Sequence, residues 1–109
     1  MNEISIMLVC QAGMSTSLLV KKMQDAADEQ KMNHNIFAIS SGEADGMLST
    51  ADIDVLLLGP QVRYLLNQYN KKLEKRNIPI DVINMANYGM MDGAAIFEQA
   101  KKLAEERKA

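Results

Sequence analysis

The residues best suited to chemistry begin at Cys10. It is followed by Gln11, Ala12, Gly13 and Met14, and then by three hydroxyl residues, Ser15, Thr16 and Ser17. None of residues 11–17 is proline, so every backbone N–H is available. If a helix begins at the hydroxyls, its first N–H groups and its positive dipole end bind a dianion. The same field favours the nucleophilic thiolate. The segment therefore predicts a cysteine that carries a phosphoryl group, with the amides of residues 11–17 stabilising its charge.

A second interpretation of this segment stays open. A free cysteine at a strand end is often a small buried hydrophobe, and serine or threonine before a helix is often only an N-cap. We expect one hydroxyl to cap the helix and another to bond the phosphate. Gly13 supplies the backbone freedom that a tight anion loop needs.

Several other kinds of site are excluded or disfavoured by what the chain lacks. A Walker A loop needs Gly-Lys-Ser/Thr, and no lysine occurs before Lys21. A cysteine phosphatase carries arginine at the sixth position after its cysteine, where this chain has Thr16. Without that bidentate clamp, rapid hydrolysis is disfavoured and a phosphoryl carrier is favoured. The single cysteine excludes an internal disulfide and any multi-cysteine metal site, and we expect no metal or cofactor.

Composition indicates one globular domain spanning residues 1–109, with 48% hydrophobic and 24% charged residues. No apolar run approaches the about 18 residues of a membrane span, and the N-terminus has no secretory signal, so we expect a cytoplasmic protein. The net charge of -2 argues against a nucleic-acid partner. Residues 1–60 hold 3 basic and 8 acidic side chains, whereas residues 61–109 hold 9 and 6. Two interpretations of this charge difference stay open: solvated helix faces, or oppositely charged surfaces that dock partner proteins.

The elements that must position Cys10 alternate between strand and helix. Apolar runs predict strands at 4–9, 35–40, 53–58 and 80–84, and helical periodicity predicts helices at 15–32, 61–76 and 92–108. Residues 41–51 fit either a loop or a short helix. This alternation predicts an α/β fold, a doubly wound four-stranded parallel sheet with helices on both faces. Ligands bind such sheets at the carboxyl edge, here at residues 10–14, 59–61 and 85–91. The only histidine, His34, is expected in a solvated turn at the opposite edge.

Three motifs carry a family resemblance. They are residues 10–23 (CQAGMSTSLLVKKM), residues 54–61 (DVLLLGPQ), and Tyr88-Gly89 with Asp92-Gly93. Over nearly the whole chain, the sequence resembles enzyme IIB components of the lactose/cellobiose class of the bacterial phosphoenolpyruvate-dependent sugar phosphotransferase system. The resemblance implies strand order 2-1-3-4, similar in outline to low-molecular-weight tyrosine phosphatases. Gln11 departs from the small residue, often serine, of related sequences.

The resemblance also implies a reaction and partners. Cys10 would take phosphate from a phosphohistidine on enzyme IIA and pass it to a cellobiose-, lactose- or chitobiose-like sugar held by the membrane-embedded enzyme IIC. Residues 11–17 would form the phosphate loop. The chain would be a monomer, transiently at the inner face of the membrane. A cysteine-dependent phosphatase and a non-catalytic regulatory module remain alternatives.

The partner must approach the sulfur closely, so the loops around it should form a rim. We expect this partner rim to comprise Gly59, Pro60, Gln61, Tyr88 and Gly89. Four methionines near the same edge, Met14, Met85, Met90 and Met91, would add a pliable apolar border.

Overall fold

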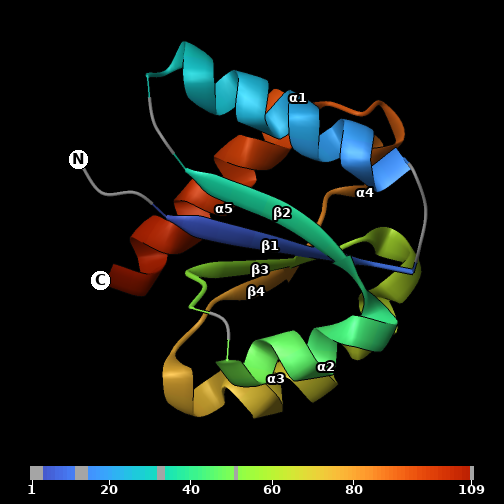
Figure 1. The fold of residues 1–109 in the computed structure, drawn as a ribbon, viewed down its shortest axis with the longest axis vertical. Helices are drawn as coiled ribbons and strands as arrows, with labels where there is room; N and C mark the ends of the chain where they lie inside the picture. The colour runs from blue at the N-terminus through green and yellow to red at the C-terminus, as the bar shows by residue number, and fades with distance from the viewer. Residues whose placement is uncertain (1–3, 12–14, 32–33, 51, 109) are drawn as a thin grey trace.

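The fold is a parallel sheet between two helical layers (Figure 1). A computed structural model describes residues 4–11, 15–31, 34–50 and 52–108. The elements are β1 (Ser5–Cys10), α1 (Ser15–Glu29), β2 (Asn35–Ser40), α2 (Ser41–Thr50), β3 (Val55–Leu58), the 3-10 helix η1 (Pro60–Leu65), α3 (Leu66–Leu73), the 3-10 helix η2 (Glu74–Arg76), β4 (Ile80–Val82), α4 (Met85–Gly89) and α5 (Gly93–Lys108). All strand pairs are parallel and the strand order is 2-1-3-4, which confirms the predicted topology.

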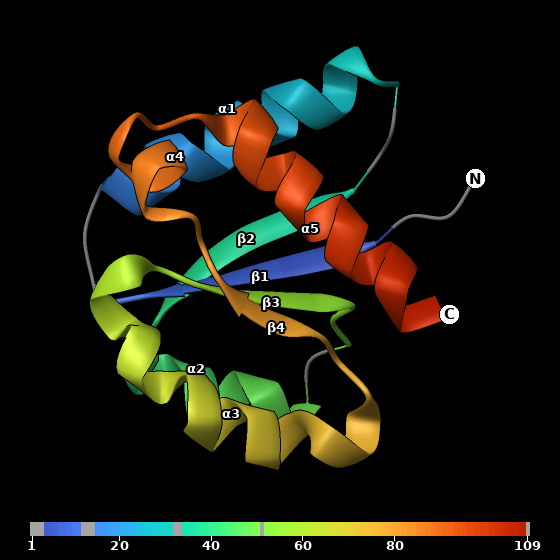
Figure 2. The same cartoon turned by 180° about the vertical axis from the view of Figure 1, so that it is seen from behind.

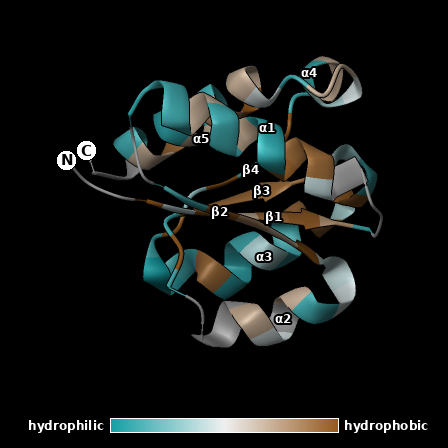
Figure 3. Cartoon of the chain, turned by 45° about the horizontal axis from the view of Figure 1, so that its top comes forward, coloured by the Kyte–Doolittle hydropathy of each residue, from teal (hydrophilic) through white to brown (hydrophobic). Residues whose placement is uncertain are grey.

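The two faces of the sheet are covered by different helices. Helices α1 and α5 cover one face, and α2 and α3 cover the other (Figures 1 and 2). The central strand β3 is buried throughout, as continuous apolar runs predict, whereas the edge strand β4 is half-buried. In Figure 3 the central strands are coloured hydrophobic, whereas the helices carry both hydrophilic and hydrophobic residues. Apolar burial on both faces therefore holds the carboxyl ends of the strands in place.

A close contact between α5 and α1 fixes the position of α1. A Cβ added at Gly93 would lie 2.6 Å from the backbone carbon of Lys22 and 2.7 Å from the backbone nitrogen of Met23. The first residue of α5 therefore touches the backbone of α1 directly, and only glycine leaves room for it. Because α1 begins shortly after Cys10, this contact also places the helix terminus beside the site.

The structure corrects several predicted boundaries. The helix predicted at 61–76 is divided into η1, α3 and η2. The backbone departs from helical angles at Val62 inside η1 (φ -117°, ψ 24°) and at Leu73 before η2 (φ -101°, ψ 4°). Residues 85–91, predicted as a loop, contain α4, and the ambiguous segment 41–51 forms α2. The first helix ends at Glu29 rather than residue 32. Strands predicted at 4–9, 53–58 and 80–84 lie at 5–10, 55–58 and 80–82.

Across the part of the chain that the structure describes, no helix combines the length and the apolar character needed to cross a bilayer.

Candidate functional site

Cys10 is the last residue of β1, at the carboxyl edge of the sheet. It is paired with Ser40 of β2, and only 3% of its surface is exposed. Helix α1 begins at Ser15, so the strand, short connection and helix expected around an anion site are present. Residues Ala12, Gly13 and Met14 lie outside the described residues, as do the side chains of Ser15 and Thr16. The phosphate loop over residues 11–17 therefore stays a prediction. Gln11 and Ser17 are exposed.

Gly59 lies directly against the thiol. Its N–H donates to the backbone oxygen of Val9 at 2.8 Å, which ties the residue after β3 to β1. A Cβ added at Gly59 would lie 3.1 Å from Cys10 Sγ. Its backbone angles, φ -61° and ψ 152°, are open to any residue, so glycine is needed here for space. Gly59 is buried, so what it contributes beside the thiol is the space left by its missing side chain, and its place in the partner rim stays a prediction.

Gln61 of η1 and Tyr88 of α4 bring these two short helices together near Cys10. Gln61 Nε2 donates to the Tyr88 hydroxyl at 3.2 Å. The position that a Cβ of Gly59 would occupy lies 2.9 Å from Gln61 Oε1 and 3.1 Å from Cys10 Sγ. Tyr88 is held by α4, which begins at the cap Asn84, whose side chain accepts from the N–H of Asn87. The Gln61 carboxamide therefore contacts the Tyr88 hydroxyl and faces the same small space beside Gly59 as the Cys10 thiol.

An open pocket of about 520 Å³ adjoins this pair. It is lined by four of the predicted rim residues, Pro60, Gln61, Tyr88 and Gly89, together with Arg63, Tyr64 and Met85. The sequence reasoning did not include Arg63 and Tyr64 in the rim. They follow a strand end, and the apolar stripe buries Val62 and half-buries Leu65, which turns residues 63 and 64 outward. The position of Arg63 and Tyr64 after a strand end and between buried and half-buried apolar residues is therefore the sequence signal that could have placed them in the rim.

Exposed apolar side chains concentrate at the carboxyl edge. Among the described residues, five large hydrophobic side chains are exposed: Leu18, Met47, Tyr64, Met85 and Met90. All except Met47 belong to the beginning of α1, to η1, or to α4 and its end, and Figure 2 shows these segments at one end of the sheet. Leu18, near the beginning of α1, is 49% exposed. Clustered exposed apolar groups indicate a surface that another molecule covers.

His34 is at the opposite edge, as predicted, but it is not solvated. It is 4% exposed, its Nδ1 accepts the N–H of Ile4 at 3.0 Å, and its ring lies 5.5 Å from that of Phe97. The sequence interpretation of a solvated turn histidine was wrong. The reason is that the first strand and the last helix close over this turn, which local sequence does not show.

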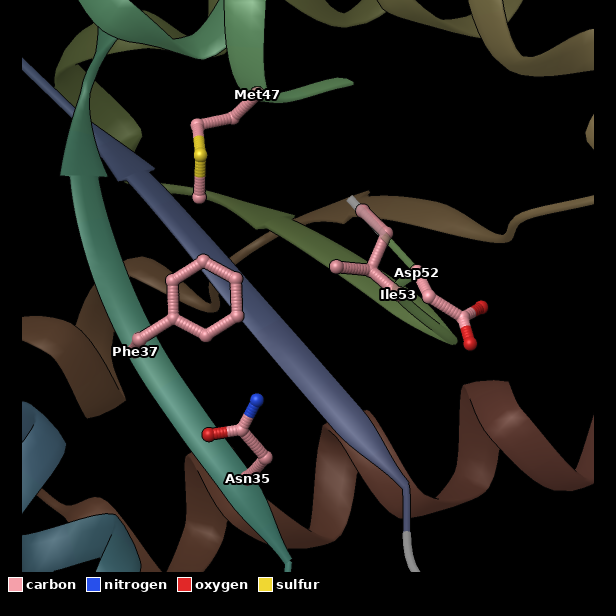
Figure 4. Close-up of a pocket in the computed structure, with 5 residues that line it drawn as sticks. All are labelled: Asn35, Phe37, Met47, Asp52 and Ile53. Atoms are coloured by element: carbon pink, nitrogen blue, oxygen red, sulfur yellow. The ribbon is translucent and has the colours of Figure 1, made fainter. Parts of the chain in front are cut away.

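A second pocket, of about 380 Å³, lies between β2, α2 and the residues before β3 (Figure 4). It is lined by Asn35, Phe37, Met47, Asp52 and Ile53. Figure 4 shows Phe37 on β2 and Met47 on α2 facing the same space, with Asp52 at its margin. Within the described ranges, no group of three or more His, Cys, Asp or Glu side chains is arranged to hold a metal ion.

Comparison with proteins of known sequence agrees with this architecture. The galactose-specific EIIB component of the phosphotransferase system (PTS) of Lactococcus lactis subsp. cremoris is 48% identical, covering 90% of this chain and 94% of that one. The cellobiose-specific EIIB component of Lactococcus lactis subsp. lactis is also 48% identical, with the same coverage. The oligo-beta-mannoside-specific EIIB component of Bacillus subtilis is 40% identical, covering 90% and 93%.

Solved structures show the same fold. The cellobiose-specific phosphotransferase IIB component of Borrelia burgdorferi superimposes with a TM-score of 0.77 at 32% identity, covering 97% of this chain and 95% of that one. The lactose-specific IIB domain of Streptococcus pneumoniae gives a TM-score of 0.78 at 15% identity, covering 94% and 98%, and supports the fold alone. The profile of the family described as "PTS system, Lactose/Cellobiose specific IIB subunit" matches residues 5–99. The chain belongs to this IIB family of the bacterial sugar phosphotransferase system.

Proposed function

We propose that the chain is a phosphoryl carrier in which Cys10 accepts phosphate from a phosphohistidine on enzyme IIA and donates it to a sugar on the membrane enzyme IIC. The observation that carries this proposal is the position of Cys10. It ends β1 shortly before α1 begins, it lies against Gly59, and it is beside the pocket formed by η1 and α4. A strand end followed by a helix N-terminus is where α/β proteins bind anions.

In the first transfer, the Cys10 thiolate attacks the phosphorus of the phosphohistidine. The S–P bond forms as the P–N bond breaks, and the electron pair of that bond stays on the imidazole nitrogen, which takes up a proton. Backbone N–H groups of residues 11–17 would hold the three equatorial oxygens. These donors stabilise the negative charge on the phosphoryl oxygens as the bond to the imidazole breaks.

In the second transfer, a sugar hydroxyl attacks the same phosphorus. The O–P bond forms, the S–P bond breaks, and Cys10 leaves as a thiolate. The hydroxyl proton goes to a base that we assign to enzyme IIC. We assign sugar selection to IIC as well, because two relatives equally identical to this chain, at 48%, carry the names of different sugars.

The docking surface for enzyme IIA is the pocket beside Cys10. Its continuity with the thiol through Gln61 suits a partner that must bring a phosphohistidine to the sulfur. The exposed side chains of Tyr64, Met85 and Met90 supply apolar contact area, and Arg63 supplies positive charge toward a phosphorylated partner. Such a carrier works as a monomer in the cytoplasm and meets IIC at the inner face of the membrane.

Reconstituted sugar phosphorylation tests the proposal. Wild type and Cys10→Ser are combined with the general phosphotransferase proteins, the cognate IIA and vesicles containing IIC. Serine is close in size to cysteine, so circular dichroism and thermal unfolding should be unchanged. Sugar phosphate formation should fall at least about 1000-fold, because an unactivated hydroxyl is a poor nucleophile.

Three outcomes would contradict the carrier role. Wild-type rates with Cys10→Ser would show that the sulfur takes no part. Rapid hydrolysis of para-nitrophenyl phosphate by the wild-type chain alone would favour the cysteine phosphatase alternative. A chain that no phosphocarrier modifies at Cys10 would favour the non-catalytic module.

A further inference from the structure

We propose that the Gln61 carboxamide is a side-chain ligand of the phosphoryl group on Cys10, oriented by the Tyr88 hydroxyl. This inference rests on the proposed carrier function and assigns it a contact outside the backbone loop. Sequence reasoning placed both residues on a rim that touches the partner protein. Their positions beside the thiol indicate a role in the phosphorylated chain itself.

The geometry brings the carboxamide to the thiol across Gly59. Gln61 Oε1 and Cys10 Sγ lie 2.9 Å and 3.1 Å from one point, the position that a Cβ of Gly59 would occupy. Because Gly59 has no side chain, nothing larger than its hydrogen fills that point. A phosphoryl group bonded to Sγ adds three oxygens around the sulfur, and the Gln61 carboxamide faces the same space beside Gly59.

Rotation of the carboxamide gives the phosphoryl group a donor without breaking the contact to Tyr88. In the present state, Nε2 donates to the Tyr88 hydroxyl and Oε1 faces the cysteine. A half-turn about the last side-chain bond would place Nε2 toward the phosphoryl oxygens and Oε1 toward Tyr88. A phenol hydroxyl both accepts and donates, so it serves either orientation. Gln61 is exposed, so neighbouring packing does not prevent this rotation.

The equilibrium constant for phosphoryl exchange with IIA separates this role from docking. Docking contacts change the rate of approach to equilibrium. The final ratio for dissociated proteins depends only on the free-energy difference between the phosphorylated and unphosphorylated forms of each protein. Phosphorylated IIA is mixed with this chain at concentrations below the dissociation constant of their complex. Both phosphoproteins are then quantified at equilibrium by intact mass. Loss of one charge-assisted hydrogen bond in Gln61→Ala should lower the constant about 10-fold.

Two further variants grade the effect. Gln61→Glu places a carboxylate against the phosphoryl dianion and should lower the constant further, about 100-fold. Tyr88→Phe keeps the ring but removes the hydroxyl that orients the carboxamide, and a smaller decrease of about 3-fold is expected. Gln68→Ala, on the exposed surface of α3, is the matched control and should leave the constant unchanged.

The possible failures are distinguishable. An unchanged equilibrium constant in both Gln61 variants, with slower exchange, would overturn this inference and assign Gln61 to docking alone. Failure of the wild-type chain to accept phosphate at Cys10 would overturn the proposed function, and this inference with it. A decrease in the Gln61 variants but not in Gln68→Ala would support the assignment.

Discussion

The two edges of the sheet use their polar side chains in opposite ways. At the amino edge, the His34 Nδ1 and the Asp54 Oδ2 accept the backbone N–H groups of Ile4 and Ser5, at 3.0 and 2.8 Å. At the carboxyl edge, Gln61 and Tyr88 contact each other beside a pocket, next to the Cys10 thiol. The amino edge therefore uses its polar groups to hold the start of β1. The carboxyl edge keeps polar groups available to a ligand or partner.

This contrast explains why the only histidine is not a candidate phosphate carrier. An imidazole that accepts a backbone N–H in the interior cannot also present that nitrogen to a phosphoryl donor. Cys10 is also buried, but it lies against Gly59, near Gln61, which lines an open pocket, and shortly before a helix N-terminus. The chemical role of a side chain thus depends on whether its reactive atom already has a hydrogen-bond partner within the fold.

Removal of His34 should have the largest effect on stability and none on transfer. His34→Ala leaves the N–H of Ile4 unsatisfied and opens a cavity beside Phe97, so the free energy of unfolding should fall by about 3 kcal/mol. Urea unfolding measures the loss. His34→Phe, which keeps a ring, and His34→Asn, which keeps an acceptor, should each lose less. Loss of phosphoryl transfer in a folded His34 variant would break the contrast between the edges.

Gly59→Ala should show the opposite pattern, a loss of transfer with little loss of stability. The backbone angles suit alanine, but the new Cβ would press on Cys10 Sγ and Gln61 Oε1. Displacement of a nucleophile by a fraction of an ångström should slow phosphoryl transfer about 10-fold. Stopped-flow or quenched-flow transfer from IIA measures the rate. Gly46→Ala is the control, since a Cβ there meets nothing within 4 Å. Equal rates in the two variants would remove Gly59 from the site.

The smallest expected effect concerns charge. Arg63→Gln removes a cation from the pocket at the carboxyl edge and should slow transfer from IIA about 3-fold at low ionic strength, with little effect at high salt. Lys75→Gln removes the same charge from η2, which leads to the opposite edge, and should leave the rate unchanged. Transfer rates across a salt series provide the measurement. Equal slowing by both variants would indicate a general charge effect in place of a local docking surface.

Much of the fold could be predicted from sequence because it depends on periodicity along the chain. Continuous apolar runs marked the four strands, and the stripe through Val62, Tyr69 and Leu73 marked a face that is buried in the structure. The strand order came from the family resemblance. Helix α4 was missed because its five residues are too few to show a helical period, although the Asn84 cap was present as a signal.

The site was only partly predictable, because its details depend on contacts between distant segments. The position of Cys10 at a strand end followed from local pattern. The burial of Gly59 depends on its bond to Val9, and that of His34 on Ile4 and Phe97. The hydrogen bond between Gln61 and Tyr88 joins residues on η1 and α4. None of these contacts leaves a periodic signal in the sequence.

The most direct test of the central claim is the location of the phosphoryl group. The wild-type chain is phosphorylated by the general phosphotransferase proteins and the cognate IIA, digested at neutral pH, and analysed by mass spectrometry. The mass of one phosphoryl group should appear on the peptide that contains Cys10 and be absent from the peptide that contains His34. A phosphoryl group on the His34 peptide, with Cys10 unmodified, would contradict the account.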